Sequence, residues 1–203
     1  PTTGRLRANM EAAGFKLEDV TDVVISHYHG DHINGLKAKD GSLVFARARI
    51  HVPAPEHAFW MDEARMNAAP PAMRGAFELA RRTLGAVPAD RLVQFEPGQE
   101  VAPGITSAAA FGHTPGMSIF TVRSEGQSFT YVADVTNIPS LFARNPDWAV
   151  VFDMNPEMAR QTRRRVFDMM VREKTLVGGF HFPFPAIGTM EVSGNGYQFR
   201  PLA

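Results

Sequence analysis

Four short apolar segments of the chain are each followed by a side chain that binds metal ions well. The segments are 23–26, 108–112, 129–133 and 176–180, and the residues that follow them are His27, His113, Asp134 and His181. Apolar runs of this length, bounded by turn residues, are typical of buried strands. In open α/β sheets, ligands bind beyond the carboxyl ends of the strands. The pattern therefore predicts an α/β fold with a polynuclear metal centre at its strand ends.

The first segment continues into the densest group of potential ligands in the chain, His27-Tyr28-His29-Gly30-Asp31-His32. Alternate residues of an extended segment face one side, so His27 and His29 are expected to reach one cation. Gly30 permits a turn, after which Asp31 and His32 begin a predicted helix and are directed at a second cation. The three later ligands would complete both coordination spheres, with a carboxylate able to bridge the two ions. Imidazole and carboxylate suit zinc, and also iron, cobalt or manganese.

A single histidine at a strand end is more often a hydrogen-bonded residue than a metal ligand. Here, however, five of the seven histidines occupy ligand-like positions. An aspartate packed among them would be costly to bury without a cation. The remaining two, His51 and His57, are interpreted as structural residues.

These motifs resemble those of the metallo-β-lactamase superfamily of dinuclear hydrolases. The resemblance rests on His27-x-His29-x-Asp31-His32, on His113 within 112–116, and on Asp134 and His181. Within the superfamily, Phe59-Trp60 and the segment 181–188 are similar to the branch that contains methyl parathion hydrolase and related lactonases. The resemblance implies a four-layer αβ/βα sandwich. It also implies that His27, His29 and His113 hold one metal, that Asp31, His32 and His181 hold the other, and that Asp134 bridges them.

Two departures from the family pattern bear on this interpretation. Several lactonases of the superfamily carry a tyrosine shortly after the bridging aspartate, whereas residues 135–138 here are Val-Thr-Asn-Ile. Family members also have further strands before the segment that matches 1–14, so we expect a single domain over 1–203 that lacks its N-terminal strands. Relatives in this branch are often periplasmic. By this resemblance the chain is expected to be periplasmic. The alternative expectation, for a protein without an export signal, is a cytoplasmic location.

Composition narrows the class of protein. An apolar fraction of 44% and a charged fraction of 21% fit a globular protein with a sizeable core. Twenty-one basic residues balance 21 acidic ones, so the charge predicts no nucleic-acid or membrane partner. The chain has no cysteine, which excludes disulfides and thiolate ligands. The basic run 163–165 is interpreted as a solvated helix face.

The periodicity of the sequence predicts alternating helices and strands. The expected helices are 3–13, 55–65, 71–84 and 156–174. The expected strands are 22–26, 43–52, 106–111, 117–123, 127–133 and 175–180, with a loop-and-strand region over 89–105. The second strand is expected to pair beside the first, and hairpin turns are expected at 124–126 and 194–196.

The chain lacks the nucleophile elbow, phosphate loop and dinucleotide fingerprint of other enzyme classes. We therefore expect the metals to carry the chemistry. Two cations lower the pKa of a bridging water and polarise a C=O or P=O oxygen, which predicts hydrolysis with a metal-bridging hydroxide as nucleophile. Asp31 is the candidate to accept or relay a proton, because it lies in the cluster.

The expected substrate is a small neutral lactone, carboxylic ester or phosphotriester. The candidate pocket residues are Trp60, Phe77, Asn137, Phe152 and Phe182. A charged β-lactam fits less well, since no Lys or Arg near the motifs stands out as a carboxylate anchor. The alternatives left open are a thioesterase, a mono-iron sulfur oxygenase and a non-catalytic protein with structural metals. A homodimer is also left open.

Overall fold

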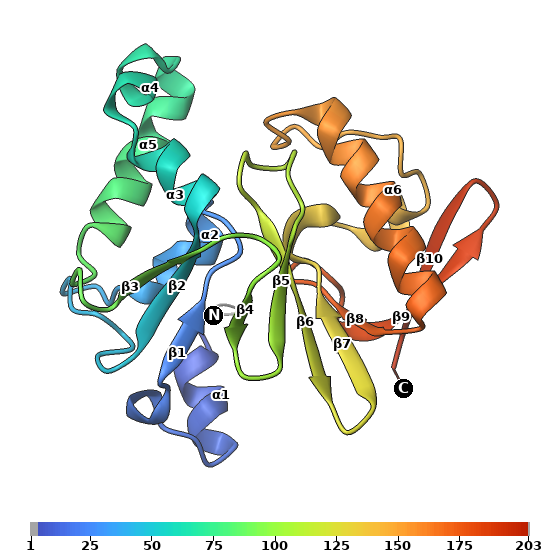
Figure 1. The fold of residues 1–203 in the computed structure, drawn as a ribbon, viewed down its shortest axis with the longest axis horizontal. Coiled ribbons are helices and arrows are strands. Elements are labelled where there is room, and N and C mark those ends of the chain that lie inside the picture. Colours follow the sequence, from blue (N-terminus) through green and yellow to red (C-terminus); the bar gives the residue numbers. More distant parts are fainter. Residues whose placement is uncertain (1–3, 203) are drawn as a thin grey trace. The chain divides into compact units, whose positions relative to one another are not determined.

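The computed structural model describes residues 4–202 and shows two compact units (Figure 1). The first unit lies within residues 1–52 and 60–94, and the second within 53–59 and 95–203. The expectation of one domain over 1–203 stays a prediction. Among the described residues, no helix is both long and apolar enough to cross a membrane.

The first unit is built on a three-stranded sheet in the order β1-β2-β3. The strands are β1 (Asp22–Val24), β2 (Arg49–Pro53) and β3 (Leu92–Phe95). Strands β1 and β2 are parallel, with Asp22 opposite Arg49, so the expected pairing is confirmed. The helices are α1 (Leu6–Ala12), α2 (Gly30–Ile33), α4 (Glu63–Ala68) and α5 (Pro71–Leu84), with 3-10 turns η1 (Leu17–Asp19) and η2 (Asn34–Leu36).

The longest helix of the first unit, α5, has the bounds that the sequence predicts. Pro71 occupies the first turn, where its fixed φ suits the helix and no amide donor is required. Its inner face buries Phe77, Ala80 and Leu84, three residues at helical spacing. Burial of such a face, rather than intrinsic propensity, supplies most of a helix's stability in a protein.

The second unit holds a seven-stranded sheet in the order β10-β9-β8-β7-β6-β5-β4 (Figure 1). The strands are β4 (Glu100–Ala102), β5 (Ile105–Ala109), β6 (Ser118–Ser124), β7 (Gln127–Tyr131), β8 (Leu176–Gly178), β9 (Ile187–Ser193) and β10 (Gly196–Pro201). Only the pair β7 and β8 is parallel among the described pairs of this sheet. The expected hairpins at 124–126 and 194–196 are confirmed.

Helix α6 (Pro156–Glu173) packs against this sheet and closes the core of the second unit. The side chain of Asn155 caps the helix by accepting a hydrogen bond from the Met158 amide, and Pro156 occupies the first turn. Val166, Phe167 and Met170 are buried in one apolar cluster with side chains of the sheet. The unit also contains the turn η3 (Ala133–Val135) and the short π-helix η4 (Pro139–Ala143).

Several expected boundaries were wrong. The expected helix 55–65 is two helices, α3 (Ala54–Met61) and α4, because Asp62 adopts an extended conformation and its side chain caps α4 through the Arg65 amide. The expected strand 43–52 begins only at Arg49, because the Ala48 amide bonds the Phe45 carbonyl in a turn. Helix α1 is shorter than the expected 3–13, of which Thr3 lies outside the described residues.

Candidate metal centre

Four of the predicted ligands lie on loops just beyond strand ends, as the sequence predicts. His27, Asp134 and His181 each stand three residues after the last residue of β1, β7 and β8, and His113 stands four after β5. The strands themselves are shorter than expected, because the residues next to each ligand turn away from the sheet. All four ligands therefore come from segments that follow strands, with Asp134 inside the short turn η3.

The first ligand cluster, His27, His29, Asp31 and His32, lies within the first unit. The His27 ring centroid lies 4.9 Å from that of His29 and 4.1 Å from that of His32. The Nε2 atom of His32 lies 3.6 Å from an Asp31 carboxylate oxygen. The hydroxyl of Ser26 lies 3.1 Å from Nδ1 of His27 and occupies that side of the ring. The cluster thus gathers three imidazoles and one carboxylate within a few ångströms.

The turn inside this cluster depends on Gly30, which begins α2. A Cβ atom at this position would lie 2.9 Å from the side chain of Leu79 in α5 and 3.2 Å from that of Asn34. The close approach of α5 therefore favours glycine here. Asp31 and His32 therefore lie on α2, whereas His27 and His29 precede it. The assignment of these two pairs to different cations stays a prediction.

The second ligand cluster, His113, Asp134 and His181, lies within the second unit. Nε2 of His113 lies 3.3 Å from Oδ2 of Asp134, and Nε2 of His181 lies 3.2 Å from the same oxygen. Two donors bound to one tetrahedral zinc at the usual bond lengths are about 3.3–3.4 Å apart. The spacing of this cluster therefore fits shared metal coordination, with one carboxylate oxygen placed between two imidazoles.

The loop that carries His113 is held from two sides. Gly112 has a φ of 127°, and a Cβ atom there would lie 2.3 Å from the backbone nitrogen of Ala159 in α6. On the other side, the buried carboxylate of Glu56 accepts hydrogen bonds from the Thr114 hydroxyl and the Gly116 amide, both 2.8 Å long. The loop conformation is thus fixed before and after the ligand.

Asp134 is held by an unusual backbone conformation. The preceding residue, Ala133, is buried and has a φ of 48°, in the left-handed region. Such a conformation costs an alanine about 1 kcal/mol, so the surrounding structure must enforce it. The turn carries Asp134 out of the β7 direction, and the Asn137 amide donates to its Oδ2 atom at 3.4 Å.

The electrostatics of the second cluster favour a cation. Burial alone would lower the pKa of His113, but hydrogen bonds and charge interactions with Asp134 and Asp153 outweigh it and raise the pKa to about 9. In the metal-free protein the two carboxylates therefore favour the protonated, cationic form of the His113 ring. A metal ion would replace this proton, since a histidine ligand must be neutral.

Sequence reasoning missed three side chains near these ligands, namely Glu56, Asp153 and Arg163. The interpretation of Arg163 as solvated was wrong, because its side chain is only 1% exposed. Buried residues of α6 recur at helical spacing around it, at Ala159, Val166 and Phe167. That 3.6-residue period places Arg163 on the inner face, and it is the signal that would have identified it.

The predicted substrate residues differ in exposure, and no finding tests their role, which stays a prediction. Trp60 is buried, and its ring centroid lies 4.7 Å from that of Phe77 and 6.3 Å from that of His29. Phe182 packs on Phe199 in the second unit, and Phe152 is 63% exposed. Asn137 is partly buried next to Asp134.

The two histidines interpreted as structural lie apart from both clusters in the sequence. His51 is buried in β2, and its Nε2 atom lies 2.7 Å from the Asp22 carboxylate on the neighbouring strand. His57 lies on α3, where burial lowers its pKa.

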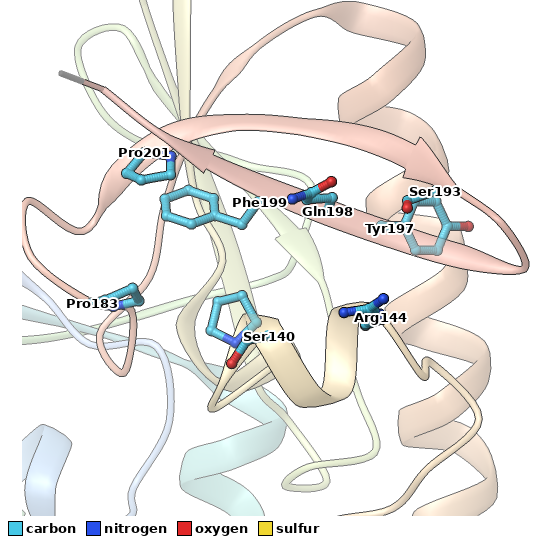
Figure 2. A pocket seen from close by; sticks show the side chains of 9 residues that line it. Ser140, Arg144, Pro183, Ser193, Tyr197, Gln198, Phe199 and Pro201 are labelled. Carbon is cyan, nitrogen blue, oxygen red and sulfur yellow. The ribbon is translucent and has the colours of Figure 1, made fainter.

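A cavity of about 250 Å³ lies within the second unit between β10 and the segment that contains η4 (Figure 2). Figure 2 shows Arg144 and Ser140 on one side of it and Phe199 and Gln198 on the other. None of the seven predicted ligands lines this cavity.

Comparison with known proteins identifies the family. Residues 1–177 match the model of the metallo-beta-lactamase superfamily. The structure of AidC, a dizinc quorum-quenching lactonase, in complex with a product is similar over 99% of this chain and 70% of that one. The TM-score is 0.90 and the sequence identity 27%.

Two further solved structures resemble the chain. The hydrolase AbOPH of the beta-lactamase superfamily is 26% identical, with a TM-score of 0.92 over 100% of this chain and 71% of that one. A probable metal-dependent hydrolase from Staphylococcus aureus shares the fold, with a TM-score of 0.71 at 21% identity over 98% and 69% of the chains. No curated protein matches. The predicted α/β fold is confirmed, and the chain belongs to the metallo-beta-lactamase superfamily.

Proposed function

We propose that the chain is a dinuclear metal-dependent hydrolase, with zinc as the preferred ion. The observation that carries the proposal is the second ligand cluster, in which Oδ2 of Asp134 lies 3.3 and 3.2 Å from two imidazole nitrogens. This oxygen suits a bridge between two cations. The proposal assigns the ligands of both clusters to one centre, with the roles that the resemblance implies for His27, His29, Asp31 and His32.

The donor set fits the chemistry of the proposed ions. Five imidazoles with two carboxylates and no thiolate suit zinc, and also iron, cobalt or manganese. Bound ions of this kind supply an activated water and polarise a carbonyl or phosphoryl oxygen. A side-chain nucleophile is then unnecessary, in agreement with the absence of a nucleophile elbow from the sequence.

The chain's own residues supply proton transfer and orientation. The side chain of Asp31 is 49% exposed, so it is able to exchange a proton with solvent while lying next to His32. The amide of Asn137 lies beside Asp134, at the loop where several lactonases of the superfamily carry a tyrosine. In this proposal an amide donor takes the place of a phenol near the bridging carboxylate.

We propose lactones as the first substrate class to examine, followed by carboxylic esters and phosphotriesters. AidC, at 27% identity, is a lactonase, and its structure contains N-hexanoyl-L-homoserine as a product. The proposed substrate is small and neutral, because no Lys or Arg stands out near the ligand motifs as an anchor for an anion.

The experiment combines metal analysis with a substrate panel. The purified protein is stripped with a chelator, reloaded with zinc, and assayed on the three substrate classes. We expect two zinc ions per chain and turnover of at least one class that is lost on stripping. His29→Ala and His181→Ala, one from each cluster, should each lower both metal content and activity. His57→Ala, outside both clusters, is the matched control and should change neither.

Other outcomes would identify the alternatives. One iron per chain with oxygen consumption would indicate a sulfur oxygenase. Turnover of a thioester, added to the panel as a fourth class, with none of the other three hydrolysed would indicate a thioesterase. Loss of stability without loss of any activity in His29→Ala would indicate structural metals. If the zinc-loaded protein turns over none of the three substrate classes, the hydrolase proposal is refuted.

A further inference from the structure

A buried aspartate and a buried arginine lie behind the second ligand cluster. The side chain of Asp153 is 0% exposed and that of Arg163 is 1% exposed. The guanidinium of Arg163 lies 3.5 Å from the Asp153 carboxylate. Removing two charges from water is costly, and a fold tolerates it only when further hydrogen bonds satisfy them. The partners of this pair therefore indicate what it does.

The first partner is the ligand His113. Oδ1 of Asp153 lies 2.9 Å from Nδ1 of His113, while Nε2 of the same ring faces Asp134 at 3.3 Å. A hydrogen bond at Nδ1 fixes the orientation of the ring and leaves Nε2 as the metal-binding atom. The backbone reinforces the contact, because the Met154 amide bonds the carbonyl of His113 at 3.0 Å. Both the ring and the main chain of His113 are thus held by the segment around Asp153.

The second partner is the loop of the ligand Asp134. Arg163 Nε donates at 2.8 Å to the carbonyl of Val135, the residue that follows Asp134. The same guanidinium donates to the carbonyls of Pro146 and Trp148, at 2.9 and 2.6 Å. The planar guanidinium presents its donors in a fixed geometry. One rigid group on α6 is therefore bonded to the loop that carries Asp134 and to the loop that leads to Asp153.

We propose that Asp153 is a positioning residue for His113, and that Arg163 holds Asp153 and the Asp134 loop in a fixed relation to each other. Together they set the spacing of His113 and Asp134 before any ion binds. This inference rests on the proposed function, because it concerns ligands of the same metal centre. Neither residue contacts the reacting atoms in this scheme, so both act through the ligands.

The test is the metal affinity of two variants at position 153. Asp153→Ala removes the charge and both acceptor oxygens. Asp153→Asn keeps one acceptor for the His113 N–H but removes the charge and the oxygen that accepts from Arg163 and from the Val150 amide. Losing such a partner typically weakens metal binding about 10–100-fold. We expect Asp153→Ala to bind one of its two ions at least about 10-fold more weakly, with Asp153→Asn between it and the wild type.

The exposed pair Asp147 and Arg164 provides the matched control. Like Asp153 and Arg163, these residues are an aspartate from the loop before α6 and an arginine of α6. Their side chains are 69% and 38% exposed, and the pair includes no histidine. Asp147→Asn should therefore leave metal affinity unchanged. Affinity is measured by competition with a chromogenic chelator, and the visible absorption of the cobalt-loaded protein reports ligand geometry. Circular dichroism of the metal-free variants checks that they fold.

The outcomes separate this inference from the proposed function. Weaker binding and an altered cobalt spectrum in Asp153→Ala, with partial recovery in Asp153→Asn, support the positioning role. Unchanged affinity and spectrum in a folded Asp153→Ala overturn it, even when the wild type binds two ions and hydrolyses a substrate. If Asp153→Ala does not fold, wild-type affinity and spectrum in Asp153→Asn together with Arg163→Lys overturn it. A wild type that binds no metal overturns both proposals.

Discussion

The buried carboxylate of Glu56 should be one of the main supports of the loop that carries His113. It accepts hydrogen bonds of 2.8 Å from the Thr114 hydroxyl and the Gly116 amide, and all three residues are buried. In Glu56→Ala both donors lose this acceptor, at a cost of about 1–3 kcal/mol for each buried group. Release of a buried charge offsets part of this loss. We expect the free energy of unfolding to fall by about 2–4 kcal/mol.

A double-mutant cycle isolates the contribution of one hydrogen bond. Thr114→Val removes the hydroxyl at nearly constant volume and should cost about 1.5–3 kcal/mol, since the bond has a charged acceptor. In the double variant this loss is already included in that of Glu56→Ala, so the coupling energy should exceed about 1 kcal/mol. The assay is urea unfolding of the metal-free protein, followed by circular dichroism and tryptophan fluorescence.

A matched control uses an exposed carboxylate. Glu191 pairs with Arg200 across β9 and β10, with both side chains 55% exposed, so Glu191→Ala should cost less than about 1 kcal/mol. A coupling energy within about 0.5 kcal/mol of zero would show that the Glu56–Thr114 bond adds no stability. A loss in Glu56→Ala no larger than in Glu191→Ala would likewise refute the reasoning.

Three further predictions concern backbone space and pH. Gly112→Ala should lower the thermal unfolding temperature of the metal-free protein far more than Gly126→Ala. Both glycines have a positive φ, but of the two only Gly126 has open space where a Cβ atom would lie. Equal losses of stability in the two variants would contradict this prediction. Burial would raise the pKa of Asp22, but hydrogen bonds from His51, Thr21 and Arg49 outweigh it and lower the pKa below 3.8. The contribution of the ionised carboxylate to stability is therefore complete above pH 3.8 and is lost as the pH falls further. Asp22→Asn should therefore flatten the acid side of the stability curve in urea titrations. Burial and a hydrogen bond raise the pKa of Tyr197 from 10.0 to about 12, so its contribution is complete below pH 10 and lost as pH rises toward 12. Tyr197→Phe should remove that alkaline loss, and an unchanged alkaline profile would count against it.

Much of the secondary structure could be predicted from local patterns. The bounds of α5 follow from its opening proline and its 3.6-residue period, and the hairpin turns follow from glycine-containing segments. The predicted boundaries were wrong where a local hydrogen bond, made by a side chain or by the backbone, ended an element or began it late. Asp62 divides the expected helix 55–65 by capping α4, and this choice depends on a local hydrogen bond that periodicity does not encode.

The candidate ligands could be predicted because their chemistry is explicit in the residue types. Histidines and aspartates that follow apolar strands can be recognised as candidate ligands from residue type and position alone. The residues that hold them could not be predicted in this way. Asp153 lies 40 positions after His113 and Glu56 lies 58 before Thr114, so only folding brings each to its partner.

The sequence by itself determined the α/β class and the set of side chains able to bind metal ions, because strand periodicity and ligand chemistry are local properties. The fold family followed from the resemblance of the ligand motifs. Only the tertiary structure decided which nitrogen and oxygen atoms of those side chains face one another. It set Nε2 of His113 and of His181 against one oxygen of Asp134, and it buried Arg163 where a run of basic residues indicated a solvated face. The physical reason is that ring orientation and charge burial depend on long-range hydrogen bonds, and these exist only once the chain has folded.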